Sequence, residues 1–150
     1  MIKLFRIDER LIHGQIAIKW SRHTGVDSIV VANDHAAENV MIQKSLKMAA
    51  PPGIKTVIKT LDAAIATLND PRCEPLKVLV LVNSPADALK MVRAVKGIPF
   101  VNIGNYGLSL IHIFMELAAE SPDMIKAGMP FITCSSPCTP KAIAANMIMV

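Results

Sequence analysis

The stretch KVLVLVNS, residues 77–84, decides the fold, because it is the most continuous apolar run among the strand-like segments of the chain. A run of alternating valine and leucine that ends in polar residues predicts a central strand covered on both faces. The helical pattern ADALKMVRAVKG follows it, and Pro85 stands where a helix tolerates proline, in its first turn. We therefore expect a buried strand followed by a crossover helix.

Strand-like and helix-like segments alternate on both sides of this unit. The other expected strands are residues 2–7 (IKLFRI), 28–34 (SIVVAND), 54–60 (IKTVIKT) and 99–105 (PFVNIGN). The other expected helices are residues 15–22, 36–50 and 61–69. No hairpin signal joins the strands, so the pattern predicts a mostly parallel sheet with right-handed crossovers. The predicted fold class is α/β, with a central sheet between two helix layers.

Composition excludes several classes of protein. With 150 residues and 52% hydrophobic residues, the chain is long enough for one domain with a real core. The longest uncharged run, residues 97–115, is interrupted by Pro99 and Asn102 and is a poor membrane span. The first residues, MIKLFRIDER, lack the apolar centre of a secretory signal, so we expect a cytoplasmic protein.

Cofactor and nucleic-acid signals are also missing. Cys73, Cys134 and Cys138 do not have zinc-like spacing, and we interpret them as reduced, incidental thiols. No phosphate-binding glycine loop of the nucleotide enzymes occurs. The basic residues are scattered and aromatic residues are few, which argues against a nucleic-acid partner. We expect neither a metal nor another cofactor.

Loops at the carboxyl ends of parallel strands carry function in open α/β sheets. In this chain they are RIDERLIHGQ (residues 6–15), NDH (33–35), NS (83–84) and NIGN (102–105). The first is the richest chemically, because His13 lies between a strand and a helix N-terminus, where backbone N–H groups favour anions. A neutral imidazole there could accept a phosphoryl group, with Arg10 neutralising its charge and Asp8 orienting the ring.

Simpler explanations exist for each of these residues. A histidine near a helix start is often a cap or a surface group, and an arginine beside acids is often a solvated ion pair. Within the first strand, Arg6 could reach the edge of the sheet or contact phosphate, and we favour the edge of the sheet. Asn33 and Asp34 fit a ligand loop or a helix cap equally well. Surface positions are expected for His23 and His35, and core positions for Met41, Met48 and Met91.

RIDERLIHGQIAIKW, residues 6–20, closely resembles the opening of the IIB components of the mannose/fructose/sorbose family of bacterial sugar phosphotransferase systems (PTS). In that family a pattern like RIDxRLIHGQVxxxW surrounds a phosphorylated histidine. The resemblance continues through SIVVAND, MAAPPG, VLVLVNSPADALKMV and VNIGNYG. It covers residues 1–107, which we interpret as a IIB phosphocarrier domain.

The resemblance implies a function. His13 would take a phosphoryl group on its delta nitrogen from a IIA phosphohistidine and pass it to a hexose bound by the membrane components IIC and IID. That is a protein-N(pi)-phosphohistidine-sugar phosphotransferase, attached to the inner face of the membrane through IIC and IID. Arg10 would neutralise the phosphoryl group and Asp8 would organise the loop, while a homodimer is expected.

The remaining site residues follow from the same resemblance. The phosphate loop and its rim would include Gly14, Gln15, Asn33, Asn102 and Gly104. A different class stays open at this point, because a regulatory module could use the same loop to bind an anion without covalent transfer. Which sugar is moved is not encoded in these motifs.

Past Gly107 the alternation fails and the resemblance stops. Residues 108–150 are an atypical continuation, with a short strand expected at PFITC (130–134), a weak helix at 119–128 and a loop at 135–140. LSLIHI, residues 108–113, is also the translation of a transposon-end adapter used in sequencing libraries. We hypothesise a chimeric or frame-altered origin for this part; a lineage-specific tail is the alternative.

Overall fold

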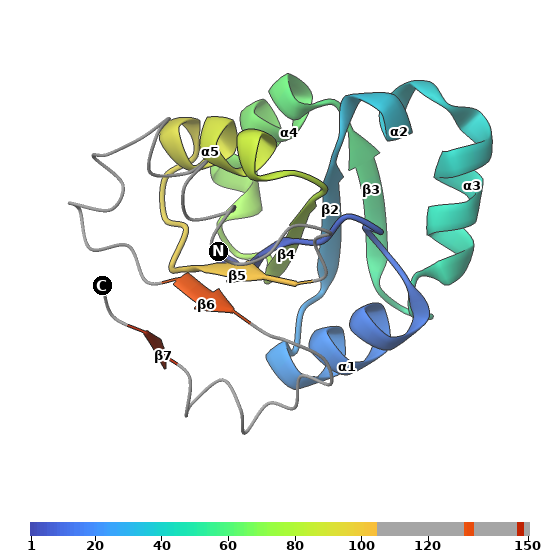
Figure 1. Cartoon of the computed structure of the whole chain (residues 1–150), viewed down its shortest axis with the longest axis horizontal. Helices are drawn as coiled ribbons and strands as arrows, with labels where there is room; N and C mark the ends of the chain where they lie inside the picture. Colours follow the sequence, from blue (N-terminus) through green and yellow to red (C-terminus); the bar gives the residue numbers. More distant parts are fainter. Residues whose placement is uncertain (105–130, 134–146, 149–150) are drawn as a thin grey trace.

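The computed structural model describes the backbone of residues 1–104, 131–133 and 147–148, and the side chains of residues 1–14 and 19–104. Its strands are β1 (Ile2–Ile7), β2 (Ser28–Ala32), β3 (Lys55–Lys59), β4 (Val78–Val82), β5 (Val101–Ile103), β6 (Phe131–Thr133) and β7 (Met147–Ile148). They form one sheet in the order β3-β2-β4-β1-β5-β6-β7 (Figure 1). Every pairing is parallel except β6 with β7. The predicted mostly parallel sheet is confirmed.

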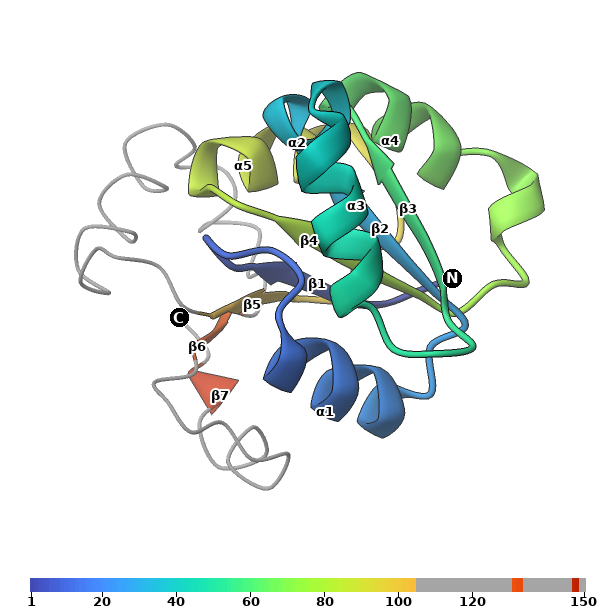
Figure 2. The same ribbon diagram turned by 90° about the vertical axis from the view of Figure 1, so that its right-hand side faces the viewer.

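The described helices are α1 (Gly14–Thr24), α2 (Asp34–Glu38), α3 (Val40–Ala49), α4 (Leu61–Leu68) and α5 (Pro85–Ala94), with a short 3-10 turn at Pro71–Cys73. They lie on both sides of the sheet: α4 and α5 above the strands and α1 below them in Figure 1, a separation that Figure 2 shows from the side. The three-layer α/β/α architecture is therefore confirmed.

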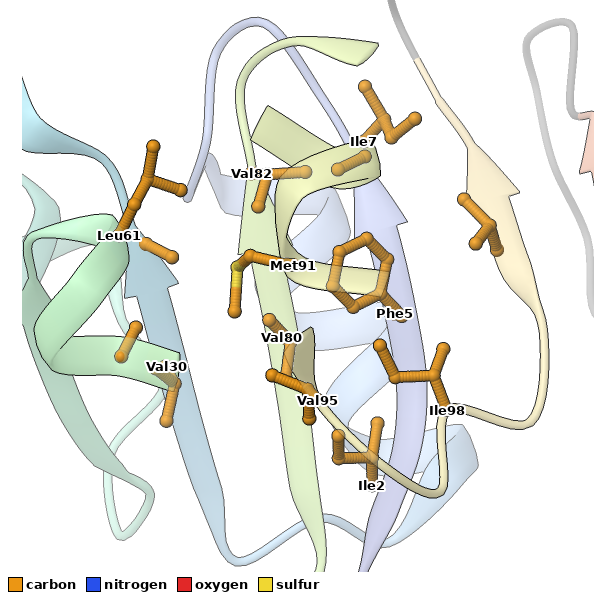
Figure 3. Close-up of a cluster of buried hydrophobic side chains, with 14 of the residues drawn as sticks. Ile2, Phe5, Ile7, Val30, Leu61, Val80, Val82, Met91, Val95 and Ile98 are labelled. Carbon is orange, nitrogen blue, oxygen red and sulfur yellow. The ribbon is translucent and has the colours of Figure 1, made fainter. Parts of the chain in front are cut away.

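Strand β4 is central among the first five strands, as its apolar run predicts. It lies between β2 and β1, and each of its five residues is at most 3% exposed. Val78, Val80 and Val82 face a cluster under α4 and α5, which includes Phe5 and Met91 (Figure 3). The alternation of a strand sends its leucines to the other face.

That other face packs against α1 and α3. Leu79 and Leu81 contact a second cluster, to which α1 contributes Trp20 and α3 contributes Leu46. Leu11 and Ile12, from the loop after β1, belong to the same cluster. The candidate loop is thus anchored by apolar burial on the α1 side of the sheet.

The single helix expected at residues 36–50 is interrupted at Asn39. This residue has an extended backbone (φ −103°, ψ 108°), and its side chain accepts hydrogen bonds from the N–H groups of Met41 (3.0 Å) and Ile42 (3.2 Å). Asparagine is among the best N-cap residues because it satisfies N–H groups that a helix start leaves unpaired. The continuous helix was a wrong expectation, since Asn39 ends α2 and begins α3.

Two of the three methionines expected in the core are exposed. Met91 is fully buried, as expected, whereas Met41 is 76% and Met48 86% exposed. Both lie on the side of α3 opposite Ile42 and Leu46, which contact the core. The core assignment of Met41 and Met48 is therefore wrong.

The expected strand in PFITC is present as β6, at residues 131–133. The weak helix at 119–128, the loop at 135–140 and two of the three cysteines, Cys134 and Cys138, lie outside the described residues. Cys73 has a free, half-buried thiol. None of the described helices is long and apolar enough to cross a membrane.

Replacing Leu81 by alanine should lower the free energy of unfolding by about 2–5 kcal/mol, because a fully buried leucine leaves a cavity. Urea denaturation measures this loss. The control is Leu76→Ala, at a residue that is 37% exposed. Its effect should stay within ~0.5 kcal/mol, the usual size of a surface change. Equal losses in the two variants would contradict the central position of β4.

Candidate functional site

A buried ion pair lies at the carboxyl end of β1. The Nε and Nη2 atoms of Arg6 donate to Oδ2 of Asp8 at 3.3 and 3.0 Å. Arg6 is 4% exposed and Asp8 is fully buried. The two residues are two positions apart, so an extended backbone directs both side chains to the same face of the sheet. This places the pair on the α1 side.

The neighbouring elements complete the surroundings of Arg6. Nη1 donates to Oδ1 of Asn102, which is the partner of Arg6 in the register of β1 and β5. The guanidinium carbon lies 5.5 Å from the centre of the Trp20 ring, within reach of a cation–π interaction. A Cβ atom at Gly104 would collide with the guanidinium, so a residue without a side chain is needed there.

Burial and charge act on Arg6 in opposite directions. Burial lowers the pKa of Arg6 below its usual value, and the adjacent Asp8 carboxylate opposes that decrease. Even a lowered arginine pKa leaves the group charged at neutral pH. The site therefore contains a permanent positive charge on Arg6.

Asp8 also shapes the loop that follows it. Its Oδ1 atom accepts from the backbone N–H of Arg10 at 3.2 Å, and its carbonyl accepts from that of Leu11 at 2.9 Å. Leu11 has φ of 54°, a left-handed backbone that is uncommon for a residue other than glycine. Backbone strain of this kind persists where surrounding contacts over-determine it. Here they are the two Asp8 hydrogen bonds and the burial of Leu11.

His13 is the residue that this loop presents. It occupies the N-cap position of α1 with an extended backbone and makes no capping hydrogen bond with its side chain. Its Nδ1 atom lies 3.4 Å from the carbonyl oxygen of Leu11 and 3.9 Å from Oδ1 of Asp8. The side chain is 25% exposed. A partly exposed imidazole above a buried carboxylate, at a helix N-terminus, is suited to receive an anionic group.

The other expected site residues are placed as follows. Arg10 has an exposed side chain, and its backbone N–H holds Asp8. Gly14 is the exposed first residue of α1, and a Cβ atom placed on it would have nothing within 4 Å. Asn102 accepts a hydrogen bond from Arg6, and Gly104 lies against the Arg6 guanidinium. The side chain of Gln15 lies outside the described residues, although its backbone belongs to α1.

Asn33 is not part of this cluster. Its Oδ1 atom accepts from the N–H of Ala36 at 2.8 Å and caps α2, while Asp34 accepts from the N–H of Leu61. Between the two possibilities open from sequence, the structure favours the cap. His23 and His35 are exposed, as expected.

Arg6 is the residue that the sequence interpretation placed wrongly. It does not reach the edge of the sheet, because β1 lies between β4 and β5. The available signal was an arginine in an apolar strand with an aspartate two residues later. A charged pair of that spacing in a central strand must be buried together.

The geometry gives no support to a metal centre. In residues 1–14 and 19–104, no three His, Cys, Asp or Glu side chains gather in a way that could hold an ion. His13 instead lies beside the carboxylate of Asp8 and the carbonyl of Leu11, at the start of α1, and that carboxylate in turn binds the buried guanidinium of Arg6.

Comparison with known proteins identifies relatives of this chain. Residues 2–115 match the model of the family described as PTS system sorbose subfamily IIB component. A probable phosphotransferase enzyme IIB component of Streptococcus pyogenes is 41% identical over 107 residues, which cover 71% of this chain and 66% of the relative. The sorbose-specific EIIB component of Klebsiella pneumoniae is 38% identical over 103 residues, covering 69% and 63%. The matches thus span just under two thirds of these relatives.

Solved structures agree on the fold. The crystal structure of the IIBSor domain of the sorbose permease from Klebsiella pneumoniae superposes with a TM-score of 0.77 at 30% identity, covering 93% of this chain and 91% of that one. An N-acetylgalactosamine-specific IIB component from Escherichia coli gives a TM-score of 0.73 at 22% identity, covering 93% and 96%. The latter shows the fold alone.

Arg6→Met should lower the free energy of unfolding by about 3–5 kcal/mol, because it leaves the buried Asp8 carboxylate without its partner. Arg10→Met is the control and should change stability by about 0.5 kcal/mol or less, since its side chain is exposed. Adding Asp8→Asn to Arg6→Met should recover part of the loss. Urea titrations that show equal stability for the two single variants would contradict the buried pair.

Proposed function

The chain belongs to the sorbose subfamily of PTS IIB components, and we propose that it is a phosphocarrier in which His13 takes a phosphoryl group from a IIA phosphohistidine and gives it to a hexose during uptake. The observation that supports His13 is its position at the start of α1, partly exposed and beside the carboxylate of Asp8. Family membership supports phosphotransfer in sugar uptake as its general role.

Two substitution steps at phosphorus make up the transfer. The lone pair of a neutral His13 nitrogen attacks phosphorus, a new N–P bond forms, and the N–P bond of the donor histidine breaks. In the second step a sugar hydroxyl attacks the same phosphorus, an O–P bond forms and the N–P bond to His13 breaks. The proton lost by the hydroxyl is balanced by the one that the departing His13 imidazole takes up, so His13 returns to its neutral state. Both steps require alignment and charge neutralisation more than covalent assistance from the protein.

The orientation of the ring decides which nitrogen is available. In the described conformation Nδ1 faces the Leu11 carbonyl and Asp8. Phosphorylation of Nδ1, which the family resemblance implies, therefore requires the ring to rotate away from Asp8. We assign Asp8 as a positioning residue that holds the unphosphorylated ring, and we keep Nδ1 as the proposed acceptor.

Arg10 is the proposed clamp on the phosphoryl group. Arg10 lies three residues before His13, and its backbone N–H is held by the carboxylate of Asp8. Its guanidinium is exposed and able to reach an incoming anion. We do not assign this role to Arg6, because its guanidinium is buried and already donates to Asp8 and Asn102. Gly14 adds open space beside His13 for the approach of a partner protein.

Partners follow from the same proposal. A IIA domain supplies the phosphoryl group, and the membrane components IIC and IID bind the hexose and hold this protein at the inner face of the membrane. A homodimer in the cytoplasm is part of the proposal. Size exclusion with light scattering measures the oligomeric state directly.

Incubation with phosphoenolpyruvate, the general phosphocarrier proteins and a matching IIA domain should add one phosphate to the wild-type chain, measured by intact mass. The gain should survive base, disappear in acid and be absent from His13→Ala. His35→Ala, at an exposed histidine, is the control and should gain phosphate normally. Nitrogen chemical shifts of the labelled ring distinguish Nδ1 from Nε2.

No phosphate on a wild-type chain that circular dichroism shows to be folded would overturn the carrier proposal. The remaining explanation would be an α/β module that binds an anion at the same loop without covalent transfer. Phosphate on both His13→Ala and the wild type would instead move the acceptor to another residue.

Arg10→Ala should slow phosphorylation of His13 by about 100-fold, the effect of removing one group that stabilises charge in a transition state. Quenched-flow labelling gives the rate, and urea denaturation should show unchanged stability. Arg22→Ala, at an exposed arginine near the end of α1, controls for the loss of one positive charge. Equal rates for the two variants would contradict the clamp.

A further inference from the structure

The two long helices that cover the α1 side of the sheet carry basic residues without acidic ones. In α1 and α3 the exposed basic side chains include Lys19, Arg22, Lys44 and Lys47, and neither helix contains aspartate or glutamate. The short helix α2 packs on the same side and carries two exposed acidic residues, Asp34 and Glu38, so these four basic residues of the long helices still outnumber the acidic ones. We call the outward surface of these two helices the basic layer.

The helices on the opposite side of the sheet are balanced in charge. Those helices, α4 and α5, contain Asp62, Asp87, Lys90 and Arg93. Lys90 lies 2.8 Å from Asp62 in a surface ion pair. The excess positive charge of the long helices thus lies on one side of the sheet. Figure 1 shows α1 on this side, below the strands.

Large apolar side chains are exposed within the basic layer. On α3, Val40 is 61%, Met41 76% and Met48 86% exposed. Val40 and Met48 flank Lys44 at helical spacings of four residues, so all three share the outward face. These are three of the five large hydrophobic residues found exposed among the described residues.

This mixture fits a lipid surface better than a protein surface. Protein interfaces place apolar residues at a centre from which lysine is depleted, whereas here Lys44 stands between two exposed apolar residues. At a bilayer, unbranched methionine and the aliphatic part of lysine enter the headgroup boundary while the ammonium stays with the lipid phosphates. Anionic headgroups also match the absence of acidic residues in both helices.

We propose that the basic layer binds reversibly to the anionic headgroup surface of a lipid bilayer. This contact is separate from phosphotransfer and does not require His13 to carry phosphate. His13 directly precedes α1. A protein bound to the bilayer through the basic layer would therefore hold the His13 loop at the edge of the bound surface. A weak contact of this kind would concentrate the protein at the membrane.

Vesicle sedimentation tests the proposal on the full chain. The wild type should bind vesicles of phosphatidylcholine mixed with phosphatidylglycerol, bind far less to phosphatidylcholine alone, and lose binding as salt is added. Lys44→Gln with Lys47→Gln should weaken binding about fivefold for each lysine, the factor that corresponds to ~1 kcal/mol per basic residue. Met41→Ser with Met48→Ser should weaken binding without changing its salt dependence.

The matched control removes the same charge from the opposite helix layer. Lys90→Gln with Arg93→Gln should bind anionic vesicles like the wild type. No binding of the wild type to anionic vesicles would overturn the proposal and leave the basic layer as a surface for an acidic protein. Equal losses in the control and in the Lys44 and Lys47 variant would overturn it too, because only net charge would then matter.

The same samples separate this proposal from the phosphocarrier function. Without vesicles, Lys44→Gln with Lys47→Gln should accept phosphate from the IIA domain at the wild-type rate. Vesicle binding by a chain that accepts no phosphate would support the lipid contact and overturn only the carrier role. Phosphate uptake by a chain that does not bind anionic vesicles would support the carrier role and overturn only the lipid contact.

Discussion

The pairing of Arg6 with Asp8 is the interaction on which the candidate site depends. A buried ion pair costs more desolvation than a surface pair, so its charges need further hydrogen bonds to be tolerated. Arg6 obtains them from Asp8 and Asn102, and a ring contact from Trp20. These residues belong to β1, β5 and α1 or directly follow them, so the pair ties two strands and a helix together at one end of the sheet. One oxygen of Asp8 is taken by Arg6 and the other by the backbone of Arg10. The loop that carries His13 therefore starts from a rigid point, whereas the His13 ring keeps access to a partner.

Much of this arrangement follows from sequence patterns. The Val and Leu run of β4 and the alternation of strand and helix predict a parallel sheet, because both patterns depend on local periodicity and burial. The rule that functional loops follow the carboxyl ends of parallel strands then selects the loop of His13 as a candidate, and the structure places that loop directly after β1. The order of neighbouring strands could not be predicted in this way. The pairing of Arg6 with Asn102 joins residues far apart in the chain, and only the three-dimensional register reveals it.

The failures of the sequence interpretation have physical causes as well. Asn39 interrupts a helical pattern because its side chain caps the next helix better than it continues the last one. Met41 and Met48 have the composition of core residues, but Ile42 and Leu46 are the α3 residues that pack on the core, so the two methionines face solvent. The packing of one helix face thus decides which methionines are exposed.

The exposed methionines of α3 and the buried Arg6 lie on the same side of the sheet, and we assign them different roles. Inside, the contacts of Arg6 and Asp8 anchor the loop that carries His13. Such fixed geometry would raise the rate of the proposed phosphoryl transfer. Outside, α1 and α3 present flexible lysine and methionine side chains, which suit weak and reversible association. The proposed carrier would deliver its group and then leave its partner, so an anchored loop and the proposed weakly binding surface are compatible on one helix layer.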